Sequence, residues 1–266
     1  MPDPSLPNRI QIDGRSAFVS DVHLSDQDPI TTQRFLSSIA ACKGQISSLF
    51  VLGDLFDAWI GDDAVDTSAQ GILANTVFTL FASLGCPVYF CAGNRDFLLG
   101  VASNGAKCQC AHGLHLLDDQ TIVRFSGAGS KTFDVLLCHG DEFCIDDTAY
   151  QAVRITLRGK AWQTQFLSKS IDERRVQATQ MRAQSKQAKD RKSPEIMDVN
   201  AVAINQAFSK YNIPLLIHGH THRPNQHDYQ DPNRTRVVLS DWDGQAQRGN
   251  VYFIAQKIID LYAKAE

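Results

Sequence analysis

Short apolar runs recur along the chain, and segments with a helical pattern lie between several of them. The runs cover residues 17–20, 49–53, 88–93, 134–140, 213–219, 236–240 and 251–256. Runs this short and this apolar are typical of strands buried on both faces. Because segments such as 32–42 and 71–84 have helical length and pattern, the alternation predicts a layered α/β fold.

One stretch breaks this pattern. Residues 154–192 contain eleven Lys or Arg and three Asp or Glu, and they include no strand-like run. Val153, Leu157, Ala161 and Phe166 recur at helical spacing. The stretch therefore predicts a basic helical insert between two strands of the core, although a solvated charged face explains its charge equally well.

Composition and charge narrow the class of protein. The 266 residues carry a net charge of −3, which indicates no nucleic-acid partner. The N-terminal residues lack the pattern of a secretory signal, and no apolar run approaches the roughly 18 residues of a membrane span. Seven cysteines are scattered without a CxxC pair. We therefore expect a cytoplasmic protein with reduced thiols, without a disulfide framework or a zinc–cysteine site.

Polar side chains follow five of the predicted strands. They are Asp21 and His23, then Asp54, then Asn94, then His139, and last His218, His220 and His222. A single Asp after a strand is commonly a turn or cap residue. Five strand ends that each carry Asp, Asn or His are better explained by a site, because functional sites of α/β sheets form at the carboxyl ends of the strands.

The residue types at these strand ends indicate metal chemistry. Carboxylate, imidazole and amide groups suit Mn²⁺, Fe or Zn²⁺, and the set contains too many imidazoles for Ca²⁺. The ligands are too many for one ion, whereas two ions about 3.5–4 Å apart, bridged by a carboxylate, use them all. We expect two divalent cations, with Mn²⁺ as the expected metal, although the ligand types also accommodate Fe and Zn²⁺.

The ordered motifs DxH, GDxxD, GNxD, HGD and GHTH, which span residues 21–222, resemble those of the calcineurin-like metallophosphoesterases. The resemblance implies a four-layer sandwich of two mixed β-sheets flanked by helices. It also implies a single domain over residues 1–266, with a helical cap insert at about 147–200. In that family's pattern, Asp54 bridges two metals, one held by Asp21, His23 and His222 and the other by Asn94, His139 and His220. His218 is left as a core or supporting histidine.

Further stretches are similar to one family within this class, the UDP-2,3-diacylglucosamine hydrolases of lipid A biosynthesis. These are "SDVHLS", "GDLFDAWIGDD", "GNRDFLLG", "HGDEFCIDD", "MRAQSK", "IMDVN" and "IHGHTHRP". The resemblance implies hydrolysis of the substrate pyrophosphate by attack of a metal-bridging hydroxide on the α-phosphorus, giving UMP and 2,3-diacylglucosamine 1-phosphate (lipid X). It also implies peripheral association with the cytoplasmic face of the inner membrane, to which a lysine-rich amphipathic insert is suited.

The same resemblance implies individual roles. Catalytic roles fall to Asn94, Arg95 and His139, and substrate contacts to Asn94, Arg95, Asp147, Ser185, Lys189, Lys192 and His220. Family members can carry Asn at the position of Lys189, which weakens that assignment. Four further carboxylates are expected to orient ligands, namely Asp57, Asp62, Asp63 and Asp96.

Arg95 departs from the wider superfamily, in which most members have histidine at this position as a general acid. An arginine with a pKa above about 12 cannot donate a proton, but its fork of donors stabilises phosphate charge. A phosphate leaving group, with a second pKa near ~6, departs without protonation. Arg95 therefore favours a pyrophosphate substrate over a simple phosphomonoester.

Two alternatives remain open. One is a phosphoesterase of the same fold that acts on soluble nucleotides, for which a long amphipathic insert has no purpose. The other is a non-catalytic scaffold, in which we would expect metal ligands to be missing, whereas all seven are present here. Acyl-chain length and oligomeric state are not predicted.

Overall fold

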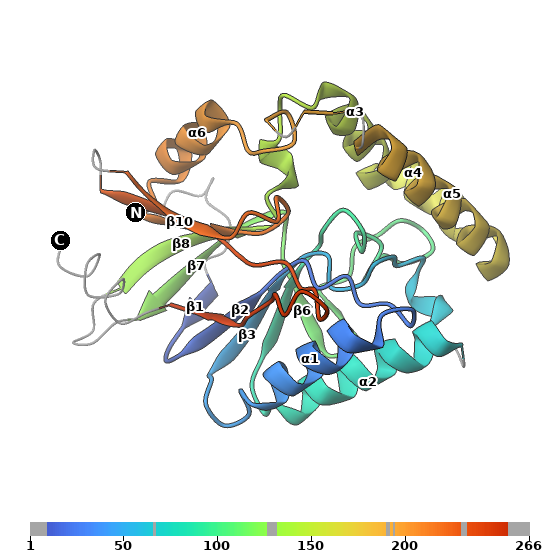
Figure 1. Ribbon diagram of the computed structural model, residues 1–266, viewed down its shortest axis with the longest axis horizontal. Helices are drawn as coiled ribbons and strands as arrows, with labels where there is room; N and C mark the ends of the chain where they lie inside the picture. The colour runs from blue at the N-terminus through green and yellow to red at the C-terminus, as the bar shows by residue number, and fades with distance from the viewer. Residues whose placement is uncertain are drawn as a thin grey trace.

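The computed structural model describes residues 10–65, 68–126, 132–189, 192–193, 195–229 and 233–254. In these residues two mixed β-sheets lie face to face between outer helices, as Figure 1 shows. The helices are α1 (Pro29–Ala40), α2 (Ala69–Ser83), α3 (Thr148–Arg158), α4 (Lys160–Leu167), α5 (Ile171–Lys189) and α6 (Ala201–Tyr211). The 3-10 turns η1 and η3 cover Asp62–Ala64 and Asp141–Phe143.

The described strands form two sheets of six. One sheet has the order β1-β7-β8-β9-β11-β10, built from Ile10–Ile12, Gln120–Ser126, Thr132–Cys138, Leu215–His218, Arg234–Val238 and Asn225–Tyr229. The other has the order β12-β2-β3-β4-β6-β5, built from Tyr252–Phe253, Ser16–Val19, Ser48–Leu52, Val88–Cys91, Leu114–Leu116 and Cys110–Ala111. The neighbours β2, β3 and β4 are parallel, as are β8 and β9.

Successive side chains of a strand face two different apolar cores, one between the sheets and one beneath the helices. In β2, Phe18 points into the apolar core between the sheets and stacks on Phe50 of β3 at 5.1 Å between ring centroids. Its neighbours Ala17 and Val19 belong to the other core, beneath α1 and α2. Successive side chains of a strand face opposite ways, so a strand buried on both faces must be apolar throughout. This is the reason for the continuous runs in the sequence.

The outer helices are fixed by caps and apolar faces. Asp28 caps α1 by accepting from the Thr31 N–H at 3.0 Å, and Ser68 caps α2. On the other side of the molecule, Phe208 of α6 is fully buried against the sheet that contains β8 and β9. The result is a layer order of helices, sheet, sheet and helix.

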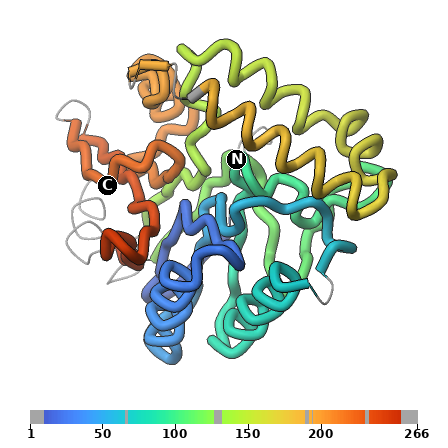
Figure 2. The backbone as a smooth tube through the Cα atoms, turned by 45° about the vertical axis from the view of Figure 1, so that its right-hand side comes forward, coloured from blue at the N-terminus to red at the C-terminus, as the bar shows by residue number. Residues whose placement is uncertain are grey.

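In the sequence, helices α3 to α5 lie between β8 and α6. Together they form an arm, which we call the cap. Figures 1 and 2 both show it projecting from the molecule on the side opposite α1 and α2. Arg174 of α5 anchors the cap to the core, because it donates to the Ile60 carbonyl at 2.6 Å and to Asp63 at 2.7 Å. The cap therefore lies over the loop that follows β3.

The structure confirms the predicted fold class and the helical character of the insert. The predicted runs contain β4, β9 and β12 and overlap β2, β3, β8 and β11, which begin one or two residues earlier. Strand β12 covers only Tyr252–Phe253, and residues 255–256 lie outside the described part of the chain. The sequence pattern did not predict β1, β5, β6, β7, β10 or α6. Within the described residues, no helix combines the length and apolarity needed to cross a membrane. All seven cysteines are free.

Candidate dinuclear metal site

The strand ends that carry the predicted ligands meet at one edge of the two sheets. Because β2, β3 and β4 are parallel neighbours, and β8 and β9 are parallel neighbours in the facing sheet, their carboxyl ends lie together. The backbone N–H of Asp21 donates a hydrogen bond to the Gly53 carbonyl at 3.1 Å, which joins two of these loops directly. All seven predicted ligands therefore stand on loops that leave this edge.

The loops hold an unusual backbone conformation. Asp21, His23, Asp54, His220 and His222 all have positive φ, between 52° and 67°. Residues other than glycine rarely adopt this left-handed conformation, and it is retained where the surrounding structure and a functional site require it. Five of the predicted metal ligands share it, which separates these loops from ordinary turns.

A first group of side chains consists of Asp21, His23 and His222. One carboxylate oxygen of Asp21, Oδ2, accepts from Ser20 Oγ at 2.6 Å and from the His220 N–H at 2.8 Å. The other, Oδ1, is buried without a hydrogen bond to any described residue. Nε2 of His23 lies 3.2 Å from Nε2 of His222. Ligand atoms of these three residues lie within 4.8 Å of one another, a spacing that suits one cation.

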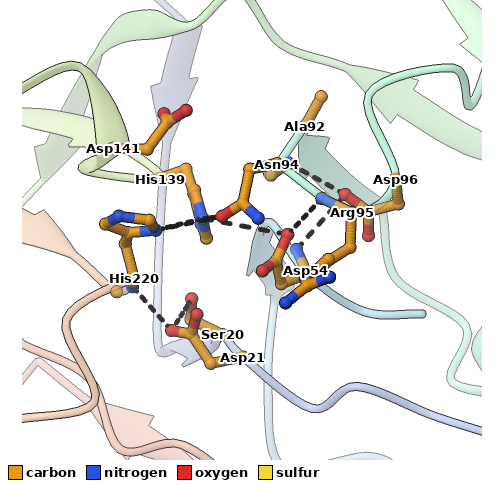
Figure 3. Close-up of polar contacts among 12 residues, drawn as sticks. Ser20, Asp21, Asp54, Ala92, Asn94, Arg95, Asp96, His139, Asp141 and His220 are labelled. Carbon is orange, nitrogen blue, oxygen red and sulfur yellow. Dashed lines mark hydrogen bonds and ion pairs between the residues drawn. The ribbon is translucent and has the colours of Figure 1, made fainter. Parts of the chain in front are cut away.

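A second group consists of Asn94, His139 and His220, whose side chains point toward one another in Figure 3. Nδ1–H of His139 donates to the Leu52 carbonyl at 2.9 Å, so its Nε2 faces the site. That Nε2 lies 3.2 Å from Asn94 Oδ1 and 3.2 Å from His220 Nδ1. A backbone acceptor on the far nitrogen is the usual way in which a ligating histidine is oriented.

Asp54 lies between the two groups. Its Oδ1 is 3.8 Å from Nε2 of His139, and its Oδ2 is 3.8 Å from Nε2 of His23. Each carboxylate oxygen thus faces a different group. This is the arrangement that a bridging carboxylate requires.

The electrostatics of the site suit neutral imidazole ligands around a cation. Burial lowers the pKa of His23 to about 4 and that of His220 to about 3, which keeps both imidazoles neutral as metal ligation requires. Burial alone would also lower the pKa of His139, but the carboxylates of Asp54 and Asp21 outweigh it and raise that pKa to about 9. The carboxylates therefore create a field that draws a cation to this point.

Two glycines let these loops approach closely. A side chain at Gly93 would overlap the Asp54 carboxylate and backbone, and one at Gly219 would overlap Ser20 and Asp21. Glycine is the residue that permits such backbone contact. The ligand loops are thus packed directly against one another.

Arg95 stands beside the second group. Its backbone N–H donates to Asp54 Oδ1 at 2.8 Å, and its carbonyl accepts from the Trp59 N–H at 3.0 Å. Its side chain is partly buried, with Nε buried and without a hydrogen bond in the described structure. Figure 3 shows the guanidinium next to Asp54, where it can meet a substrate anion.

Of the residues of the cap predicted to contact the substrate, Asp147 and Lys192 contact each other. Asp147 caps α3 through the Tyr150 N–H at 3.0 Å, and its carboxylate pairs with Lys192 at 2.5 Å across the two ends of the cap. Ser185 is exposed on α5. The side chain of Lys189 lies outside the described residues.

The four expected supporting carboxylates divide into two kinds. Asp96 lies beneath the ligand loops, and Asp57 pairs with Arg182 of α5 at the edge of the site. Asp62 instead accepts from Trp59 Nε1 at 2.9 Å, and Asp63 pairs with Arg174. The expectation that all four orient ligands is therefore wrong for Asp62 and Asp63, which fasten the loop after β3 to itself and to the cap.

His218 is a core histidine, as expected. It is fully buried, and burial lowers its pKa to about 3. Its Nδ1–H donates to the Gly219 carbonyl at 2.9 Å, and its Nε2 accepts from Arg236 at 3.2 Å. It supports the loop that carries His220 from behind.

Sequence reasoning missed several residues that contact the site. Asp141 is fully buried and accepts from the Tyr150 hydroxyl at 2.6 Å and from Arg154 at 2.8 Å, while the Tyr150 ring stacks on His220. Asp241 lies 3.5 Å from Nδ1 of His222. Only Asp141 carried a signal in the sequence, as the last residue of the HGD motif.

Comparisons with known proteins agree with this geometry. The family model described as calcineurin-like phosphoesterase matches residues 14–224. Relatives named UDP-2,3-diacylglucosamine hydrolase are 41% identical in Bordetella pertussis, over 89% of this chain and 88% of theirs, and 38% identical in Aromatoleum aromaticum, over 86% and 89%. The relative of the same name from Xanthomonas campestris pv. campestris (strain ATCC 33913) is 41% identical over 85% of this chain and 90% of that protein. The chain therefore belongs to the calcineurin-like phosphoesterases and, among them, to the family of UDP-2,3-diacylglucosamine hydrolases.

Proposed function

We propose that this protein is a metal-dependent hydrolase of the pyrophosphate bond of UDP-2,3-diacylglucosamine, producing UMP and 2,3-diacylglucosamine 1-phosphate. The name shared by its relatives supports the substrate. The observation that carries the reaction type is the position of Asp54, whose two carboxylate oxygens face two separate groups of ligands. A protein that bound one ion would not need this arrangement.

The residues present fit a pair of divalent cations. One cation would be held by Asp21, His23 and His222, and the other by Asn94, His139 and His220, with Asp54 shared. The fit rests on the buried Oδ1 of Asp21, which has no hydrogen bond in the described structure and lies 3.6 Å from Nε2 of His222, and on imidazole nitrogens only 3.2 Å apart. A cation between these atoms would satisfy them. When bound, such ions supply Lewis acidity, lower the pKa of water and neutralise phosphate charge. We propose Mn²⁺ as the metal, and the combination of oxygen ligands and imidazoles without thiolate suits it, as it also suits Fe and Zn²⁺.

The chain's own groups then orient the substrate. The guanidinium of Arg95 would bind the phosphate that leaves, since its fork of donors stabilises anionic oxygen without giving up a proton. His139 and Asn94 would act through the second metal, and His220 would in addition border the substrate. These roles account for an arginine where a general acid would otherwise stand.

A cavity next to the site supports an acylated substrate. It has a volume of about 360 Å³ and lies between the loop after β3, the start of α2 and helix α5. Much of its wall is apolar, with Trp59, Ile60, Val65, Ala74 and Ala178 among the lining residues. Ser25, two residues after the ligand His23, reaches the same wall. An apolar cavity that opens beside a charged site suits a phosphate headgroup with acyl chains.

The remaining proposed contacts lie at the base of the cap. Asp147 and Lys192 form a charged pair there, and with Ser185 and Lys189 they would contact the sugar and its phosphate. The neighbouring Asp57–Arg182 pair borders the cavity. We further propose that the whole chain is one domain, with the cap as an insert at about 147–200.

Peripheral binding to the cytoplasmic face of the inner membrane would deliver this substrate. Val153 and Ile155 of α3 and Val176 of α5 are exposed on the cap. Exposed apolar side chains on basic helices favour reversible contact with anionic lipid headgroups.

The experiment that tests this function compares two substrates in the presence of Mn²⁺. Turnover of UDP-2,3-diacylglucosamine is measured beside that of unacylated UDP-N-acetylglucosamine. We expect kcat/KM to be at least about a hundredfold higher for the acylated substrate, because apolar burial supplies binding energy. Equal values would indicate a phosphoesterase of soluble nucleotides, and no hydrolysis of either would indicate a non-catalytic scaffold.

A further inference from the structure

Arg158, the last residue of helix α3, reaches from the cap into the core. Its side chain is only 16% exposed. Nη2 donates to the carbonyl oxygens of Ala92 and Gly93, both at 3.1 Å, and Nη1 donates to Asp119 at 2.8 Å. A residue of the cap thus binds the backbone that follows β4.

Those two carbonyls belong to the peptide bonds that lead into Gly93 and Asn94, immediately before Arg95. The same segment is held from its other side by Asp96, whose carboxylate accepts from the Gly93 N–H at 2.8 Å. The segment is therefore fixed between a guanidinium of the cap and a buried carboxylate of the core. Small shifts of such a segment would move both an expected metal ligand and the expected phosphate-binding arginine.

Arg154, one helical turn earlier, provides a natural comparison. It pairs with Asp119 at 2.9 Å and with Asp141 at 2.8 Å, and its side chain is 15% exposed. Arg158 pairs with the same two carboxylates, at 2.8 Å and 3.8 Å. Burial and ion pairing are thus similar for the two arginines, whereas bonds to the Ala92 and Gly93 carbonyls are recorded for Arg158 and not for Arg154 within the described structure.

We propose that Arg158 is a positioning residue, which places Asn94 and Arg95 for catalysis by bonding the carbonyls before them when α3 is docked. The inference rests on the proposed hydrolase function and extends it, since it makes the cap a part of the metal loop as well as a cover for the substrate. Arg158 acts through the loop and not through contact with substrate.

The test compares Arg158→Gln with Arg154→Gln in the full chain with Mn²⁺ bound. Both variants lose ion pairs, so we expect both to lower the melting temperature by similar amounts. For Arg158→Gln we also expect kcat to fall roughly ten- to a hundredfold, with KM changed much less, because misplaced catalytic groups lose rate at this scale. Backbone hydrogen exchange in the peptide that covers 92–96 should become faster in this variant, and not in Arg154→Gln.

Equal exchange at 92–96 in the two variants, or a wild-type kcat in Arg158→Gln, would overturn the inference. If the wild-type protein hydrolyses neither substrate, the proposed function fails, while the exchange comparison still decides the role of Arg158. If Arg158→Gln does not fold, Arg158→Lys carries the test. A single ammonium cannot span both carbonyls and Asp119, so we expect kcat to drop about fivefold or more. Wild-type kcat and exchange in that variant would contradict the proposal.

Discussion

The carboxylate of Asp96 holds the backbone of Asp54, accepting its N–H at 3.2 Å from a fully buried position. The same carboxylate accepts from the N–H of Leu55 at 2.7 Å and from that of Gly93 at 2.8 Å. One side chain therefore binds the loop of the expected bridging ligand and the loop that carries Asn94. The spacing of the two loops therefore depends on this carboxylate, together with the bond from the Arg95 N–H to Asp54 Oδ1.

Replacing Asp96 by asparagine should separate the loops. Asparagine offers one acceptor oxygen, and its amide would face backbone donors, which leaves buried N–H groups unpaired. We expect the free energy of unfolding to fall by about 1–3 kcal/mol, together with a large loss of Mn²⁺ affinity. Urea denaturation and metal titration measure the two effects. Wild-type metal affinity in a folded Asp96→Asn protein would show that the loops are positioned by other contacts.

Replacing Gly219 by alanine should damage the site while leaving the core intact. The added Cβ would lie 2.7 Å from the Ser20 Cβ and would overlap the Asp21 carboxylate, so the loop with His220 and His222 must move away. We expect activity to fall at least about a hundredfold with circular dichroism unchanged. Gly85→Asn is the control, because its Cβ meets nothing within 4 Å and asparagine tolerates the positive φ. Full activity of Gly219→Ala would contradict the close packing of these loops.

Removing the shared carboxylate should affect both metals. In Asp54→Ala neither cation keeps its link to the other group, so we expect less than one bound Mn²⁺ per chain and no measurable turnover. His222→Ala removes a ligand from the first group alone and should retain one ion. Metal content after gel filtration distinguishes the two variants. If Asp54→Ala keeps two ions and wild-type activity, the assigned roles are wrong.

The anchor between the cap and the core should weaken in acid. The hydrogen bond from Arg174 holds the pKa of Asp63 below its usual 3.8. A carboxyl whose pKa is lower in the folded state stabilises that state above its unfolded pKa, and the contribution disappears as pH falls through the folded value. We therefore expect wild type to be more stable than Asp63→Asn at pH 6, with the difference lost as pH falls below 3.8 and through the lowered pKa of Asp63.

The difference should be no more than about 1 kcal/mol, because the side chain of Asp63 is 62% exposed. Urea denaturation of both proteins at a series of pH values measures it. A difference that does not shrink as the pH is taken well below 3.8 would show that the pairing with Arg174 does not stabilise the fold.

The local sequence pattern was sufficient to predict where the strands of the site end and which residues form most of the buried core. The apolar runs before Asp21, Asp54 and His139 are buried strands because both faces of each sheet are covered, and the parallel order brings their ends together. Strands such as Gln120–Ser126 were missed because polar residues interrupt them, at Thr121 and Arg124, within a short segment. Helix α6 was missed because its buried face consists of only Ala203, Ile204, Ala207 and Phe208, and the two alanines add little to an apolar pattern.

Contacts between the cap and the core could not be predicted in the same way. Asp141 binds Tyr150 and Arg154, and Asp63 binds Arg174, which is 111 residues away. No periodicity or spacing specifies which basic residue of an insert meets which carboxylate of the core. The predicted role of Asp63 as support for a ligand was wrong for this reason, since its partner is fixed only by the docking of α5.

The central claim is that this site hydrolyses a pyrophosphate by attack of water at the phosphorus next to uridine. The direct measurement is mass spectrometry of both products after turnover of UDP-2,3-diacylglucosamine with Mn²⁺ in water enriched in ¹⁸O. We predict one heavy oxygen in UMP and none in 2,3-diacylglucosamine 1-phosphate. Label in the lipid phosphate would contradict the assigned point of attack, and the absence of both products would contradict the account as a whole.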